Sequence, residues 1–140
     1  MDQTEIQRAW GTLFLRLVLG LLFVQGAWWR IFDLGVTEHA RRFFVTPYAE
    51  TFLPEWALWI AGVGVPFAEM IGGLLVLLGL WRLQGLILLG GVLVLVTFGH
   101  LVTEPIYSIS GHIFPRLVLV VALLLIPPSW DRFSVDARRS

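Results

Sequence analysis

Apolar residues occur along this chain in long runs separated by short polar stretches, a pattern that predicts membrane-spanning helices. Crossing a hydrocarbon core of about 30 Å takes roughly 20 helical residues. Four runs approach or reach that length, and the last of them is the shortest. We therefore predict an all-α integral membrane protein, a single transmembrane domain over residues 1–140, with four transmembrane helices in an antiparallel bundle. The expected spans cover about residues 12–31, 56–80, 83–102 and 113–126.

The tryptophan positions agree with four alternating spans. Indole rings prefer the interface between membrane and water. With four spans, the tryptophans divide between the two interfaces. We expect one interface to hold Trp10, Trp81 and Trp130, and the other to hold Trp28, Trp29, Trp56 and Trp59.

Residues 33–55, between the first two runs, are too polar to cross a membrane and too aromatic for a free linker. Thr37 is placed to cap a short helix that continues to Val45. We predict a short helical connector that lies on the outer membrane surface or over the mouth of the bundle. It is either a packed connection or a lid and docking surface for a partner.

Composition and charge remove several classes of function. The chain is 57% hydrophobic and 14% charged, whereas soluble domains are about 45–50% apolar. Its formal net charge is zero and all ten basic residues are arginine, so nothing indicates binding to nucleic acid or a polybasic lipid-binding patch. Cysteine is absent, which excludes disulfides, thiolate metal sites and thiol redox relays. Any redox role therefore needs a bound cofactor or a partner.

Arginine positions give the expected orientation. Short cytoplasmic flanks carry an excess of arginine and lysine. The face predicted to hold both termini carries more arginines than the opposite face, so we expect both termini in the cytoplasm. The first face has Arg8, Arg82, Arg132, Arg138 and Arg139, with Arg16 just inside, and the opposite face has Arg30, Arg41, Arg42 and Arg116.

One carboxylate, Glu69, lies in the middle of the second run. It shares a helical stripe with Gly62, Pro66 and Gly73, the residues that allow close helix packing, so it should point into the bundle. A charge at the bilayer centre costs about 2.5–3.5 kcal/mol on insertion scales, so Glu69 needs a cation or hydrogen-bond donors unless it stays protonated. We predict a contact with Arg16, or alternatively with Arg116. Its role is either to join two helices or to transfer a proton.

A second group of polar residues gathers in the outer half of the predicted bundle. Imidazole and guanidinium groups can donate to the carbonyl oxygens of a quinone, and an apolar slot can hold its ring. The alternative is that these side chains solvate the outer loop or pair with one another. We expect no metal site, because the spacing of the histidines and Glu104 matches no established metal motif. The candidates for binding a quinone or another cofactor are Arg30, His100, Glu104, His112 and Arg116.

Two segments resemble a known family. The first span reads "LRLVLGLLFVQGAWWRIFD", with basic residues near both ends and two glycines between them. The second contains "AEMIGGLLVLLGLWR", a glutamate followed by a double glycine, a leucine run and an arginine. Over about residues 12–126 the chain resembles the DoxX family of small four-helix bacterial membrane proteins, which is related to the membrane subunit of thiosulfate:quinone oxidoreductases. The resemblance implies a place in the bacterial inner membrane.

The resemblance also implies a function. It leads us to expect a membrane subunit of a redox or electron-transfer assembly that interacts with quinone at its outer face. The alternative is a non-catalytic accessory subunit that packs against a larger membrane complex. Expected partners are the lipid bilayer and other membrane subunits, and quinone is the expected cofactor.

Overall fold

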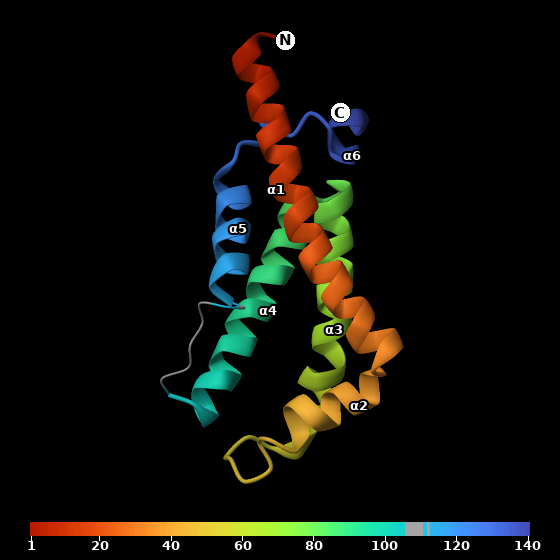
Figure 1. The fold of residues 1–140 in the computed structure, drawn as a ribbon, viewed down its shortest axis with the longest axis vertical. Coiled ribbons are helices and arrows are strands. Elements are labelled where there is room, and N and C mark those ends of the chain that lie inside the picture. The colour runs from red at the N-terminus through yellow and green to blue at the C-terminus, as the bar shows by residue number, and fades with distance from the viewer. Residues whose placement is uncertain (106–110, 112) are drawn as a thin grey trace.

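A computed structural model describes residues 1–105, 111 and 113–140, and the regular elements within this part of the chain are all helical. His112, one of the predicted binding residues, lies outside the described residues. Two of the helices are followed directly by a π-helical turn. The elements are α1 (Gln3–Trp28), η1 (Trp29–Asp33), α2 (Val36–Ala40), η2 (Arg41–Val45), α3 (Glu55–Leu78), α4 (Arg82–Thr103), α5 (Ile113–Leu125), η3 (Pro128–Trp130) and α6 (Val135–Arg139) (Figure 1).

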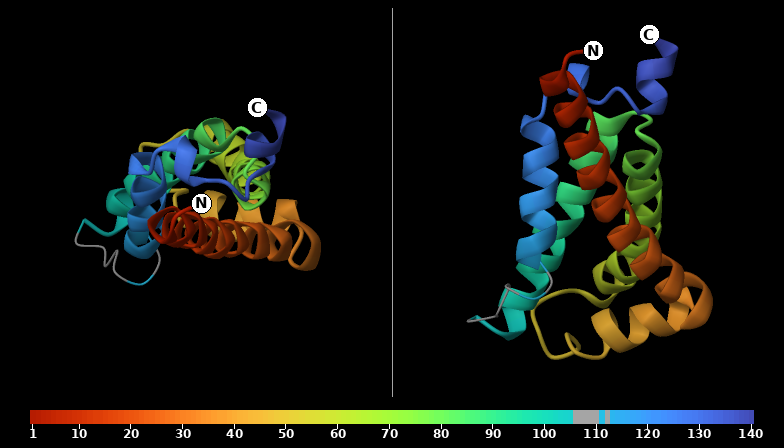
Figure 2. Two further views of the ribbon diagram at one scale, coloured as in Figure 1. Left: turned by 90° about the horizontal axis from the view of Figure 1, so that it is seen from above. Right: turned by 45° about the horizontal axis from the view of Figure 1, so that its top comes forward.

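The four longest helices alternate in direction. In Figure 1, α1 and α4 run downward and α3 and α5 run upward, so both termini lie at the same end. We call this the terminus end, and the opposite end, which holds α2, the connector end. Figure 2 shows α1 crossing the molecule, from beside α5 near the terminus end to beside α3 and α2 at the connector end.

Three helical segments are long and apolar enough to cross a membrane: Gln3–Asp33, Glu55–Leu78 and Arg82–Thr103. The fourth apolar helix, α5, has only 13 residues. Length and composition therefore indicate a multi-pass membrane protein. Trp56 and Trp81 lie beyond or near opposite ends of α3, as their sequence positions predicted.

The first helix extends beyond the predicted span, and the prediction for the cap of the connector helix needs correction. The first helix begins at Gln3, well before the predicted start, because Asp2 and Glu5 cap it reciprocally: Asp2 Oδ1 accepts from the Glu5 amide at 2.7 Å and Glu5 Oε2 from the Asp2 amide at 3.1 Å. Thr37 does not cap the connector helix. Gly35 precedes α2 instead, with a φ of 91° that favours glycine.

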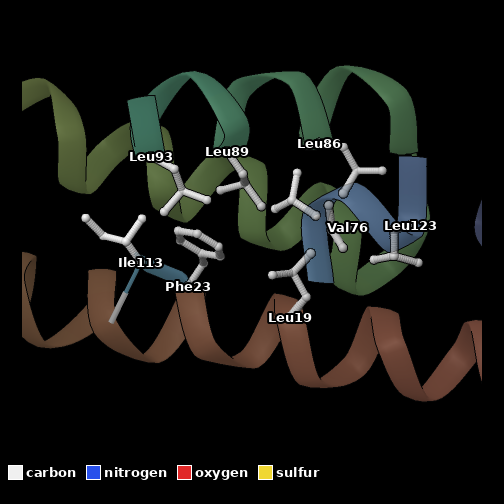
Figure 3. Packing of buried hydrophobic residues seen from close by; sticks show 9 residues of the cluster. Leu19, Phe23, Val76, Leu86, Leu89, Leu93, Ile113 and Leu123 are labelled. Atoms are coloured by element: carbon white, nitrogen blue, oxygen red, sulfur yellow. The ribbon is translucent and has the colours of Figure 1, made fainter. Parts of the chain in front are cut away.

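The hydrophobic core lies between the four long helices. Leu19 and Phe23 of α1 face Val76 of α3, as Figure 3 shows. Helices α4 and α5 complete the cluster with Leu86, Leu89, Leu93, Ile113, Val120 and Leu123.

Glycines set how closely α3 approaches its neighbours. A Cβ atom on Gly20 of α1 would lie 2.9 Å from the Cα atom of Leu77, and one on Gly73 would lie 2.9 Å from the side chain of Val24. These two contacts fix the antiparallel register of α1 and α3, because small residues let helices meet at the backbone. The predicted stripe is confirmed, since Glu69 and the three small residues that share its face are buried.

A buried group of charged residues closes the terminus end. The side chains of Arg16 and Asp131 are only 2% and 5% exposed, and Arg16 Nε lies 2.9 Å from Asp131 Oδ1. Asp131 Oδ2 lies 3.3 Å from Nη1 of Arg82, at the start of α4. Arg16 also donates to the carbonyl oxygens of Val76 and Leu77. We call Arg16, Arg82 and Asp131 the terminus-end cluster; it joins α1, α3, α4 and the segment after α5.

Candidate functional site

Glu69 forms its ion pair with Arg30, not with Arg16. The contact joins Arg30 Nη1 to Glu69 Oε2, and Arg30 lies in the π-helical turn at the end of α1. The predicted pairing with Arg16 is therefore wrong, because Arg16 is held by Asp131. The alternative partner, Arg116, lies within electrostatic range of Glu69.

The register of α1 and α3 explains this choice of partner. Gly20 lies against Leu77 and Val24 against Gly73. Continuing the same antiparallel register places residue 28 opposite residue 69 and residue 16 opposite residue 81. An arginine two residues beyond position 28 can therefore reach Glu69, whereas Arg16 lies several helical turns away.

A cavity of about 440 Å³ adjoins this ion pair at the connector end. It is bounded by the end of α1, by the connector, and by the facing sides of α3 and α4. Most of its wall is aromatic or aliphatic. The lining residues are Trp29, Arg30, His39, Phe43, Phe44, Tyr48, Leu53, Ala57, Leu58, Ala61, Val65, Glu69, Leu95, Val96, Phe98, Gly99 and His100.

The cavity exists because α3 and α4 meet closely near one end only. Near the terminus end, a Cβ atom on Gly85 would lie 3.2 Å from the carbonyl oxygen of Gly72. From this contact the two helices separate toward the connector end, as Figure 1 shows. Side chains of the connector cover the space between them.

His39 of the connector is buried and contacts the backbone of α3. Its Nδ1 atom lies 3.0 Å from the carbonyl oxygen of Gly62, and the whole residue is 3% exposed. The rings of Phe43 and Phe44 lie close to the imidazole, with centroid distances of 5.4 and 5.5 Å. Burial lowers the pKa of His39, the hydrogen bond to Gly62 opposes this effect, and the Arg30 charge adds to it. The ring is therefore neutral near pH 7.

Glycine also positions this part of the connector. A Cβ atom on Gly62 would lie 2.7 Å from the Cα atom of Ala40, so α2 rests directly on the backbone of α3. Because His39 precedes Ala40, this contact places the imidazole ring beside the carbonyl group to which it is bonded.

The structure brings together only part of the predicted site. Arg30 and His100 both line the cavity, and Glu69 lines it with them. Glu104 is exposed and outside the lining. The guanidinium group of Arg116 lies over the ring of Phe23, 5.8 Å from its centroid. Among the described residues, no three His, Asp or Glu side chains converge to hold a metal ion.

Sequence reasoning missed two polar residues of the cavity, His39 and Tyr48. Both belong to the connector, which the sequence predicts to lie on the membrane surface or over the mouth of the bundle without indicating which of its side chains enter a cavity. The available signal was the position of His39 four residues before Phe43, which places both side chains on one face of a helix. Tyr48 gave no comparable signal, because it lies in an irregular segment between two prolines.

A larger cavity of about 850 Å³ lies at the terminus end. It borders Arg82 and Asp131, which pair with each other. Arg82 Nη2 also donates to the carbonyl oxygen of Ile126 at 2.8 Å. We therefore assign the candidate site to the cavity at the connector end.

Fold and site define a class of protein: a multi-pass α-helical membrane protein with a mainly apolar cavity that holds an arginine–glutamate pair and two histidines. No known protein family, curated protein or solved structure matches the chain. Its function must therefore be argued from the cavity.

Proposed function

We propose that this chain is a membrane subunit of a redox or electron-transfer assembly and that it binds a quinone head group in the connector-end cavity. The observation that carries the proposal is the meeting of Arg30, Glu69, His39 and His100 in one aromatic-walled space of about 440 Å³. Such a space is within the usual size range of small-molecule sites, which are mainly apolar with a few polar groups.

The chemistry of the wall suits a quinone. A planar ring with two carbonyl oxygens needs hydrogen-bond donors at its edge and flat apolar surfaces above and below. Arg30 is 31% exposed at its side chain and has further N–H groups besides the one that contacts Glu69. The rings of Phe43, Phe44 and Trp29 supply flat surfaces.

The proposal includes the membrane arrangement. We place α5 as a fourth span, supported by its apolar composition and by its direction toward the terminus end, antiparallel to α4 (Figure 1). The arginine distribution supports a cytoplasmic terminus end. The resemblance to the DoxX family supports a bacterial inner membrane and a quinone-linked assembly as the setting.

The second candidate is a non-catalytic accessory subunit. It is favoured by the exposed aromatic side chains near the connector end, which offer a surface to a larger membrane complex. Trp28, Phe32, Phe52 and Trp56 are each more than half exposed, at 51%, 61%, 78% and 68%.

Quinone binding to the chain in lipid nanodiscs tests the proposal. Titration with a short-tailed benzoquinone should give saturable binding above that of empty nanodiscs. Arg30→Gln and His100→Ala should each weaken it about tenfold, because losing one hydrogen bond to a buried ligand costs roughly 1–2 kcal/mol.

Glu104→Gln provides the matched control, since Glu104 is charged and near His100 in sequence but exposed and outside the cavity. It should bind quinone as the wild type does. Absence of saturable binding, or equal binding by all four proteins, would return the chain to the accessory class. Purification in mild detergent supplies a second readout, since a quinone-linked subunit should retain quinone and redox partners.

A further inference from the structure

We propose that the connector-end cavity selects ligands that carry a hydroxyl donor, and that His39 accepts the hydrogen bond from this hydroxyl. The inference rests on the proposed function, because it concerns the same cavity and narrows the ligand class from quinones in general to the reduced, hydroquinone form. It concerns binding alone and involves no transfer of protons or electrons.

The tautomer of His39 follows from its partner. A carbonyl oxygen can only accept, so the hydrogen in the 3.0 Å contact with Gly62 is carried by Nδ1 of His39. A neutral imidazole carries one hydrogen, which leaves Nε2 with a lone pair. The nearby rings of Phe43 and Phe44, together with the burial of the residue, restrict rotation of the imidazole. His39 lines the cavity, and the proposal places its Nε2 acceptor at the cavity wall.

The charge state of the ring supports this assignment. Burial, followed by the positive charge of Arg30, lowers the pKa of His39 against the opposing effect of the bond to Gly62. A protonated ring would carry hydrogens on both nitrogens and could accept nothing. Near pH 7 the acceptor is therefore available.

Arg30 and Glu69 strengthen the preference for a ligand with a hydroxyl group. Arg30 can only donate, whereas the Glu69 carboxylate can only accept while it is paired with Arg30. A ligand that satisfies this set must bring both a hydrogen-bond acceptor and a hydrogen-bond donor. The two carbonyl oxygens of a quinone only accept, whereas each hydroxyl of a hydroquinone also donates.

The hydrogen bond that a quinone cannot make to Nε2 of His39 provides the discrimination between quinone and hydroquinone. A bound quinone would cover Nε2 of His39 and give it no hydrogen, and a buried acceptor left without a partner is costly. A hydroquinone of the same size would fill the same space and satisfy this nitrogen. The expected preference for hydroquinone is about tenfold, the effect of one hydrogen bond.

The test measures two affinities for each protein under anaerobic conditions in lipid nanodiscs. The probes are a short-tailed benzoquinone and its hydroquinone, and empty nanodiscs give the background from partition into lipid. The readout is the ratio of the two dissociation constants. Lost packing weakens both ligands together, so a merely structural role for His39 leaves this ratio unchanged.

Two substitutions test the roles of the two ring nitrogens of His39 separately. In His39→Asn, the side-chain amide can still donate to Gly62 from near the position of Nδ1, but nothing replaces the acceptor at Nε2. In His39→Gln, the amide oxygen can reach the position of Nε2, but the bond to Gly62 is lost. Asn should therefore reduce the preference for hydroquinone about fivefold, and Gln should retain it with a lower thermal stability.

The outcomes distinguish this inference from the proposed function. If wild-type protein binds quinone as tightly as hydroquinone, or if His39→Asn keeps the full preference, the role of His39 is wrong while the cavity remains a quinone site. If neither probe binds saturably, the proposed function and this inference both fail. The wild-type ratio provides the test even if one variant does not fold.

Discussion

Both ends of this molecule pair an arginine with a buried carboxylate, but the two arginines differ in exposure and in their other contacts. At the terminus end, Arg16 is 2% exposed at its side chain and contacts Asp131 and several backbone carbonyl oxygens. At the connector end, Arg30 is 31% exposed and, among the described residues, pairs with Glu69 alone. Buried charge by itself therefore does not mark a functional site. The distinguishing property is hydrogen-bonding capacity left over beside a cavity.

The largest expected effect comes from breaking the terminus-end cluster. Asp131→Asn removes the negative charge between Arg16 and Arg82 and leaves a buried guanidinium without a counterion. The free energy of unfolding should fall by about 3 kcal/mol, the range found when one partner of a buried pair is removed. Unfolding in mixed detergent micelles measures it.

Glu38→Gln is the control for this change. Glu38 is 39% exposed at its side chain and pairs with Arg41 and Arg42 on the surface of the connector. Removing such a pair should change the stability by less than about 1 kcal/mol. If the two variants were equally stable, the buried terminus-end cluster would contribute no more to the stability of the fold than a surface ion pair.

The next effect concerns the contact that sets the register between the two ends. Gly20→Ala places a methyl group 2.9 Å from the Cα atom of Leu77, so the two helix backbones must separate or slide. We expect a loss of about 1–3 kcal/mol, the usual cost of overpacking. Because the shift moves Arg30 relative to Glu69, quinone affinity should fall as well.

Gly64→Ala is the matched control, since a Cβ atom there meets nothing within 4 Å. This variant should be as stable as the wild type or slightly more so, because alanine favours a helix over glycine. Equal losses in the two variants would show that register does not depend on the close contact at Gly20.

Substitution at the connector end should lower the stability less than the two changes above, but it should weaken quinone binding. Glu69→Gln removes the charge opposite Arg30 but keeps an oxygen that can accept a hydrogen bond. Because Arg30 is partly exposed, the loss of stability should be about 1 kcal/mol, well below that of Asp131→Asn. Quinone titration should nevertheless show weaker binding, since Arg30 is no longer held in place. If Glu69→Gln lost stability but bound quinone with unchanged affinity, the proposed role of the connector end in quinone binding would be contradicted.

The smallest expected effect depends on pH. Since the pKa of His39 is lowered in the folded chain below its usual value near 6.5, folding favours the neutral ring. Its contribution to stability is present above about pH 6.5 and declines as the pH falls toward the folded pKa, by at most about 1.4 kcal/mol per pH unit. Unfolding measured at several pH values should show this decline.

His39→Asn should show less of this decline than the wild type. Arg30 from the end of α1, Glu69 from α3, His100 from α4 and Tyr48 from the connector all line the same cavity as His39. The comparison of the two proteins therefore isolates the contribution of His39. Identical pH profiles would contradict it.

Much of the fold followed from sequence, whereas the pairing of charges did not. Hydropathy placed α3 and α4 within a few residues of their observed ends, and the glycine stripe gave the inward direction of Glu69. The partner of Glu69 depended on the register set by Gly20 and Leu77, a contact between helices that no local pattern encodes. Asp131 was overlooked because it follows the last apolar run, where a buried carboxylate is not expected.

The candidate site was predicted only in part, because some of its residues are brought to the cavity by contacts between helices that no local pattern encodes. Arg30 and His100 were recognised because both lie near the outer ends of apolar runs, where depth can be read from sequence. Glu104 was grouped with them by depth and by its place one helical turn after His100, although it is exposed. His39 lies in a short helix whose position depends on the close contact between Ala40 and Gly62, so only the folded chain places it in the cavity.

Photolabelling with an azido-benzoquinone tests the central claim most directly, namely that the connector end binds quinone and the terminus end does not. Mass spectrometry of the labelled chain in nanodiscs should find the adduct on η1, the connector or the facing parts of α3 and α4 that line the cavity, and excess unlabelled quinone should suppress it. Labelling at the terminus end around Arg82 and Asp131, or spread evenly over lipid-facing side chains and insensitive to competitor, would contradict the account.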